Sequence, residues 1–182
     1  MALNVGYLTC DRTASGDEIY TPYYAVEPLF EFVPKDKTIW CPFDEEWSAF
    51  YQMFTEKGYK VIRSSLADGQ DFFTYKPSEE WDILISNPPF SKKDEVLKRA
   101  FYLQKTFALL LPVNSLQGKK RFEIFKNQVQ ILVFDARVDY HSNGNMKEYS
   151  KGNSFGSAYF CKDLLPTKLE MRKLNKYDRA LA

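Results

Sequence analysis

The strongest constraint on the fold of this chain is one short stretch, residues 81–90, which reads WDILISNPPF. Its first half is an apolar run of strand length, which predicts a short buried strand. Proline has a fixed φ and no N–H, and it pushes the residue before it out of the α region. Pro88 and Pro89 therefore end the strand in a rigid elbow that presents the amide of Asn87 and the ring of Phe90.

This elbow suits the methylation of a flat exocyclic amine such as N6 of adenine. Such an amine is a poor nucleophile, because its lone pair is delocalised into the ring. The side-chain oxygen of Asn87 and the carbonyl of Pro88 can accept its two hydrogens, while Phe90 stacks on the ring and fixes the angle of attack. The same residues also fit an ordinary Asn-Pro turn, which commonly opens a loop. The elbow alone leaves both interpretations open.

The bulk properties exclude several classes of site. The chain has 182 residues, which is enough for one domain with a substantial core. His141 is the only histidine, which argues against histidine triads and multi-histidine metal sites. The three cysteines lack CxxC spacing, so we expect reduced thiols and no metal. Because no apolar run is long enough to span a bilayer and the N-terminus lacks a signal pattern, we expect a cytoplasmic protein that does not bind membranes.

Charge is divided unevenly along the chain. Residues 1–90 carry 7 Lys and Arg against 15 Asp and Glu, whereas residues 91–182 carry 18 against 9. This asymmetry predicts a polyanionic partner for the second half. A solvated basic surface without a partner is the alternative that charge alone does not exclude.

The order of predicted elements favours a single α/β domain over residues 1–182, because the sequence contains no repeat and no linker. Residues 106–113 form a continuous apolar run, as expected for a central parallel strand buried on both faces. We expect an irregular arm over residues 1–17. The charged C-terminal tail, residues 163–182, is predicted to be a surface helix or a frayed end.

Three further segments stand in a fixed order with the elbow: IYTP at 19–22, CPFD at 41–44 and DFF at 71–73. Together they resemble the class I S-adenosylmethionine-dependent methyltransferases of the N6-adenine type, particularly the small forms found in bacteriophages. The resemblance covers roughly residues 18–162. It implies a Rossmann-like domain with a mostly parallel sheet and an antiparallel last strand, which inserts beside the strand at 129–134.

The resemblance implies that S-adenosylmethionine is the cofactor and assigns residues to it. The methionine end of the cofactor would contact Tyr20, Thr21 and Pro22. The loop beneath the cofactor would be Cys41, Pro42 and Phe43. The residues flanking the adenine of the cofactor would be Asp71 and Phe72. The target base would be held by Asn87, Pro88, Pro89 and Phe90.

The resemblance also implies a nucleic acid substrate, with DNA expected. A target base in duplex DNA must be extruded from the stack before it can reach the elbow. The basic second half would then supply phosphate contacts. The residues predicted for this role are Lys92, Lys93, Lys119, Lys120 and Arg121. Solvated helix and loop ends are the alternative interpretation of these five.

The chain departs from the family pattern in three places. The first loop, residues 42–47, contains no glycine, and residues 63–65 lack the acidic group that usually binds the ribose. The interval from Tyr59 to Trp81 is too short for a helix and a third strand, so we expect the sheet to be trimmed at that edge. Despite these departures, the leading hypothesis is an active adenine-N6 methyltransferase. The alternatives are a catalytically silent fold that acts as a binding or regulatory module, and methylation of a protein glutamine amide.

Overall fold

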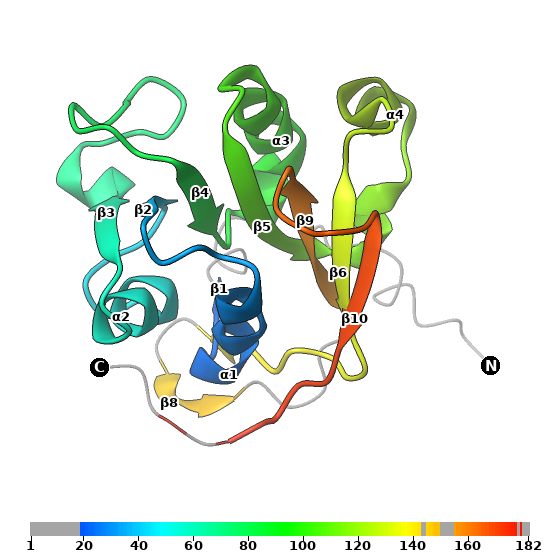
Figure 1. The fold of residues 1–182 in the computed structure, drawn as a ribbon. Coiled ribbons are helices and arrows are strands. Elements are labelled where there is room, and N and C mark those ends of the chain that lie inside the picture. The colour runs from blue at the N-terminus through cyan, green and yellow to red at the C-terminus, as the bar shows by residue number, and fades with distance from the viewer. Residues whose placement is uncertain (1–18, 143–144, 150–154, 178, 180–182) are drawn as a thin grey trace.

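A seven-stranded sheet in the order β10-β6-β9-β5-β4-β2-β3 forms the centre of the molecule (Figure 1). The computed structural model describes residues 19–142, 145–149, 155–177 and 179, so the arm predicted over residues 1–17 lies outside the described part. The strands of the sheet are β2 (Thr38–Pro42), β3 (Lys60–Ser64), β4 (Ile83–Ser86), β5 (Thr106–Pro112), β6 (Gln130–Phe134), β9 (Ser157–Lys162) and β10 (Leu169–Arg172).

Within this sheet β9 is the antiparallel strand, and it lies between β5 and β6. The other six strands run parallel to one another, and β2, β4 and β5 are adjacent. The predicted α/β fold is confirmed, and so is the antiparallel strand beside β6, although this strand is β9 and is followed in the chain by the parallel strand β10. The central strand β5 is also buried as predicted, because Phe107 to Leu111 are at most 1% exposed.

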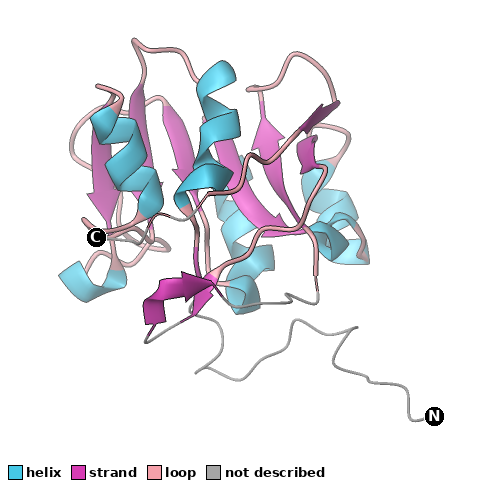
Figure 2. Cartoon of the chain, turned by 90° about the horizontal axis from the view of Figure 1, so that it is seen from below, coloured by secondary structure: helices cyan, strands magenta, loops and turns pink. Residues whose placement is uncertain are grey.

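Helices cover both faces of the sheet, so the domain has three layers (Figure 2). The α-helices are α1 (Tyr23–Val26), α2 (Ala49–Glu56), α3 (Lys93–Tyr102) and α4 (Lys119–Phe125). The 3₁₀ helices are Glu27–Glu31, Leu66–Asp68, Phe90–Lys92 and Val113–Leu116. No helix in the described part of the chain is long and apolar enough to cross a membrane.

A second, small sheet joins residues 19–20 to residues 141–149. Strand β1 (Ile19–Tyr20) pairs antiparallel with β7 (His141–Ser142), which in turn pairs with β8 (Asn145–Tyr149). This pairing fixes the segment that leads into α1 beside the carboxyl ends of the parallel strands.

The sheet is trimmed at the β3 edge, as predicted. Between β3 and β4 the chain forms the 3₁₀ helix Leu66–Asp68 and no strand. The adjacent strand β2 therefore has β3 as its outer neighbour, and β3 is the edge.

The predicted surface helix or frayed end over residues 163–182 is wrong for residues 169–172, which form β10 at the opposite edge of the sheet. Sequence pattern did not reveal this strand, because an edge strand with an exposed face needs few apolar residues; Leu169 and Met171 point to solvent. The strand is fixed by its ladder with β6 and by Arg172, whose guanidinium donates to both carboxylate oxygens of Glu31 at 2.6 and 2.7 Å.

Candidate functional site

A cavity of about 540 Å³ lies at the carboxyl ends of β2, β3 and β4. Open α/β sheets bind their ligands at this edge, because the loops that follow parallel strands converge there. The described residues that line the cavity come from β1 and the start of α1, the loop after β2, the start of α2, the loop after β3, and the elbow. They are Ile19, Tyr20, Thr21, Phe43, Asp44, Glu45, Trp47, Ser48, Ala49, Phe50, Ser65, Leu66, Ala67, Asn87, Pro88 and Pro89.

The elbow holds the Asn87 amide in one orientation. The Nδ2 group of Asn87 donates to the carbonyl of Ile19 at 3.1 Å, which leaves the Oδ1 atom as an acceptor. This Oδ1 atom is buried and has no hydrogen-bond partner among the described residues. A buried acceptor without a partner is costly, so this atom is suited to a ligand that brings an N–H group.

The loop after β2 keeps the backbone shape that a glycine would favour, although it contains none. Phe43 has a φ of 74°, in the left-handed region that side chains rarely adopt. Its ring packs against Phe72, with ring centroids 4.8 Å apart, and it also lines the cavity. The missing glycines are therefore replaced by a strained aromatic residue that covers the cavity with apolar surface.

Asp44 is an acidic residue of this loop that sequence reasoning did not assign to the site. It lines the cavity and is only 4% exposed. The hydroxyl of Ser86 donates to its Oδ2 atom, and the Ser48 hydroxyl is a second hydrogen-bond partner. Burial raises the pKa of Asp44 to about 7, and the two serine hydroxyls oppose this rise. Its position directly after a strand that ends beside Asn87 was the signal that could have identified it.

The residues predicted to bind the cofactor fall into two groups. Tyr20, Thr21 and Phe43 line the cavity. The other five do not: Pro22, Cys41, Pro42, Asp71 and Phe72.

The positions of three of these five residues explain why they are not part of the lining. Cys41 is completely buried in the core, and Phe72 is buried against Trp40, with ring centroids 5.6 Å apart. The carboxylate of Asp71 accepts from the N–H of Phe73 at 2.9 Å and closes a local turn. The described lining also contains Ser65, Leu66 and Ala67 from the loop after β3, which were not predicted to bind the cofactor.

Phe90 does not line the cavity, whereas its three predecessors in the elbow do. Its side chain is 5% exposed and packs edge-to-face against Phe155 and Tyr140, with centroid distances of 5.5 and 6.2 Å. With 5% of its side chain exposed, Phe90 has no open ring face on which a base could stack in this structure.

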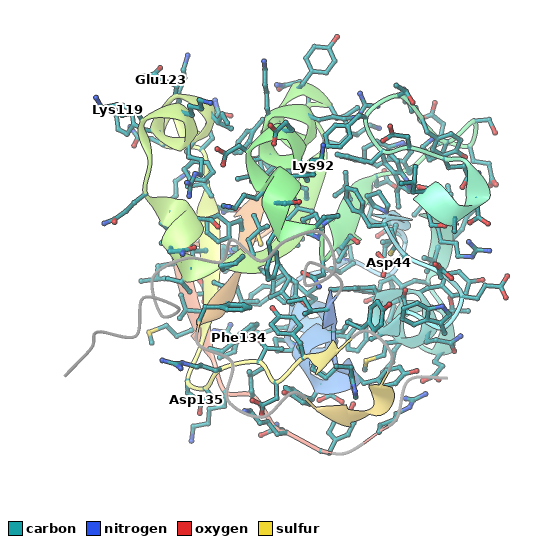
Figure 3. The ribbon with its side chains drawn as sticks, turned by 180° about the vertical axis from the view of Figure 1, so that it is seen from behind. Asp44, Lys92, Lys119, Glu123, Phe134 and Asp135 are labelled. Carbon is teal, nitrogen blue, oxygen red and sulfur yellow. The ribbon has the colours of Figure 1, made fainter. Side chains whose placement is uncertain are left out.

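Of the residues predicted to contact phosphate, Lys92 ends the 3₁₀ helix before α3 and Lys93 begins α3, whereas Lys119, Lys120 and Arg121 lie on α4. Figure 3 labels Lys92 and Lys119. Lys92, Lys119 and Lys120 are exposed. Lys93 is half-buried and donates to the carbonyl of Phe90 at 3.2 Å. The charge of Arg121 is already paired within the protein, because its Nε atom lies 3.0 Å from a carboxylate oxygen of Asp94.

An aromatic residue that sequence reasoning missed accompanies these lysines. Phe122 on α4 is 73% exposed, and Leu116 in the preceding 3₁₀ helix is 40% exposed. Together with Lys119 they border a shallow hollow on the surface. Exposed aromatic residues among lysines are typical of surfaces that bind single-stranded nucleic acid.

No protein-family model matches this sequence. No curated protein matches it either. The fold does have solved neighbours. A crystal structure from Listeria monocytogenes, described as that of a candidate class I S-adenosylmethionine-dependent methyltransferase, superposes with a TM-score of 0.53. The match covers 94% of this chain and 70% of the other, at 13% sequence identity.

The chain has a class I methyltransferase-like fold. At 13% sequence identity, similarity to the Listeria structure shows the fold of this chain and does not show its reaction. Within this fold, the cavity at the carboxyl ends of the strands and the elbow that borders it form the candidate site.

Proposed function

We propose that this protein transfers a methyl group from S-adenosylmethionine to the N6 amine of adenine in a nucleic acid, with DNA as the expected substrate. The observation that supports this most directly is the buried Oδ1 atom of Asn87, which has no partner in the described part of the chain. It lies in the elbow that borders the cavity, beside Pro88. An exocyclic amine has two hydrogens to donate, and Oδ1 can accept one of them while the Pro88 carbonyl accepts the other.

The residues around the cavity fit the cofactor. Its volume of about 540 Å³ is within the range of small-molecule sites. Tyr20 and Trp47 pack edge-to-face with centroids 4.6 Å apart and form an aromatic wall. The hydroxyl of Thr21 is buried and has no partner among the described residues, so it is available to a polar ligand. When bound, S-adenosylmethionine supplies an electrophilic methyl group on a sulfonium.

The side chains of this protein then have to orient the amine. Asn87 and Pro88 restrict the orientation of the amine and direct its lone pair toward the methyl group, which is catalysis by positioning. We expect Phe90 to stack on the base after its aromatic neighbours Phe155 and Tyr140 have moved. Because the reacting amine needs no prior deprotonation, the site requires no strong base.

Detection of the methylated base tests this proposal. The purified protein is incubated with methyl-labelled S-adenosylmethionine and with single-stranded DNA, duplex DNA or RNA, and digests are analysed for N6-methyladenine by mass spectrometry. We expect label in adenine. Label only in a glutamine-containing peptide would identify a protein substrate. Cofactor binding without any transfer would support a silent binding module.

For the substrate-binding surface, we expect the double substitution Lys119→Ala and Lys120→Ala to weaken binding to single-stranded DNA and to reduce its salt dependence. Each lost phosphate contact lowers the slope of log affinity against log salt by about 0.7, so the pair should lower it by about 1.4. Fluorescence anisotropy between 50 and 200 mM salt measures this slope.

The matched control removes two exposed lysines outside α3 and α4, Lys57 after α2 and Lys76 between β3 and β4, which should leave the slope unchanged. Phe122→Ala should weaken binding at every salt concentration by about 1–3 kcal/mol, because it removes stacking and no charge. If the control substitutions and the Lys119/Lys120 pair lower the salt slope equally, the nucleic acid does not bind at the start of α4.

A further inference from the structure

Asp44 lines the cavity, and its buried carboxyl group has no cationic partner among the described residues. Among the described residues no Lys or Arg forms an ion pair with it, and its hydrogen-bond partners are the hydroxyls of Ser86 and Ser48. A buried carboxylate normally has a positive partner, because removing the charge from water is costly. Asp44 has none in the part of the chain that the structure describes.

The surroundings of Asp44 add no positive charge. The described residues that line the cavity include two acids, Asp44 and Glu45, and no Lys, Arg or His. Outside the lining, Cys41 and Tyr159 lie close enough for the Asp44 charge to contribute to raising their pKa values, behind the larger effect of burial. All of these groups are acids, so none can neutralise the carboxylate.

Two other buried oxygen atoms in the same lining lack partners in the described part of the chain. They are Oγ1 of Thr21, a residue that is 5% exposed, and Oδ1 of Asn87. Because Oδ1 of Asn87 is assigned to the target amine, the Thr21 hydroxyl and the Asp44 carboxyl remain for the cofactor, and the described lining contains no basic side chain. Such a lining selects a ligand that carries positive charge and N–H donors.

We propose that the carboxylate of Asp44 is the counter-ion for a cationic group of the ligand that this cavity binds. This inference rests on the proposed function, since S-adenosylmethionine carries both an ammonium group and a sulfonium. The aromatic side chains of Tyr20 and Trp47 in the same lining add attraction for a cation.

The proposal links ligand binding to protons. Burial holds the pKa of Asp44 at about 7, so below pH 7 much of the protein has a neutral carboxyl at this position. A cationic ligand favours the ionised form, so its binding releases a proton and its affinity rises with pH. Between pH 5.5 and 7.5 this rise should be tenfold or more, on the order of the change in the ionised fraction.

Calorimetric titration with two nucleosides tests the assignment. S-adenosylmethionine carries the cationic groups, and 5′-methylthioadenosine is a neutral nucleoside that lacks both. Asp44→Asn should weaken S-adenosylmethionine binding by about tenfold to a hundredfold and change methylthioadenosine binding by less than about threefold. The pH dependence of S-adenosylmethionine affinity should disappear in the variant.

Glu45→Gln is the matched control, because it also removes one acid from the lining. The Glu45 carboxylate already accepts from the indole N–H of Trp47 at 3.0 Å, so this substitution should have a smaller effect than Asp44→Asn. Equal weakening of both nucleosides by Asp44→Asn would show a structural role and overturn the proposal. So would unchanged binding of S-adenosylmethionine, or wild-type protein that prefers the neutral nucleoside at pH 7.5.

The same titrations separate this inference from the proposed function. If S-adenosylmethionine binds in the expected Asp44-dependent way and no methyl group reaches adenine, the counter-ion assignment stands and the proposed reaction fails. If methyl transfer occurs and Asp44→Asn binds the cofactor as tightly as the wild type does, the reaction stands and the counter-ion assignment fails.

Discussion

Replacement of Asn87 by Ala should lower the rate of methyl transfer by a factor on the order of 100 or more, while cofactor affinity changes little. The substitution removes the Oδ1 acceptor, which has no hydrogen-bond partner in the described part of the chain and which we expect to hold the target amine. Single-turnover transfer of labelled methyl to an oligonucleotide measures the rate, and calorimetry measures the affinity. Wild-type turnover in the variant would mean that the elbow is only a turn.

The variant also tests whether Asn87 matters for folding. Loss of the bond from Nδ2 to the Ile19 carbonyl should cost about 1 kcal/mol of stability, which thermal denaturation can detect. The matched control is Gln128→Ala, which truncates an exposed amide ahead of β6. A loss of activity in Asn87→Ala with a small change in melting temperature therefore identifies positioning of the substrate.

The elbow and the sheet could be predicted from sequence because local chemistry determines them. Two consecutive prolines end a strand whatever surrounds it, and a fully apolar strand such as β5 has only the core to enter. The short interval before β4 likewise left no room for another strand, which correctly predicted the trimmed edge.

The direction of individual side chains could not be predicted in the same way. Asp71 and Phe72 hold the order expected from the resemblance, yet one closes a local turn and the other is buried against Trp40 and Phe43. Order along the chain places a segment near an edge of the sheet, and packing decides which of its side chains face the cavity.

Strand β10 and Asp44 were missed for related reasons. A partly exposed edge strand needs no apolar pattern, so its charged sequence resembled that of a surface segment.

Asp44 stands in a run of acids, which usually marks a solvated loop. Its burial follows from the contact of the loop with β3, where the N–H of Asp44 donates to the Ser64 carbonyl at 3.2 Å.

Asp44→Asn should make the unliganded protein more stable at pH 8 than the wild type, by about 2–4 kcal/mol. The pKa of Asp44 is raised from 3.8 to about 7, so between these values the folded protein holds a proton that the unfolded chain has released. Wild-type stability therefore falls as pH rises from 4 to 7, and then levels off. Asparagine does not titrate, so the variant should not show this part of the fall.

Urea denaturation of both proteins at pH 4, 6 and 8 measures the difference directly. Other carboxyls whose pKa is lowered by ion pairs, such as those of Glu31 and Glu56, contribute equally to both proteins and cancel in the comparison. The stability difference should be near zero at pH 4 and largest at pH 8. A difference that does not change with pH would mean that the Asp44 carboxyl is not buried in its ionised form. A stability gain at pH 8 combined with weaker binding of a cationic nucleoside would show that this acid is retained for its ligand.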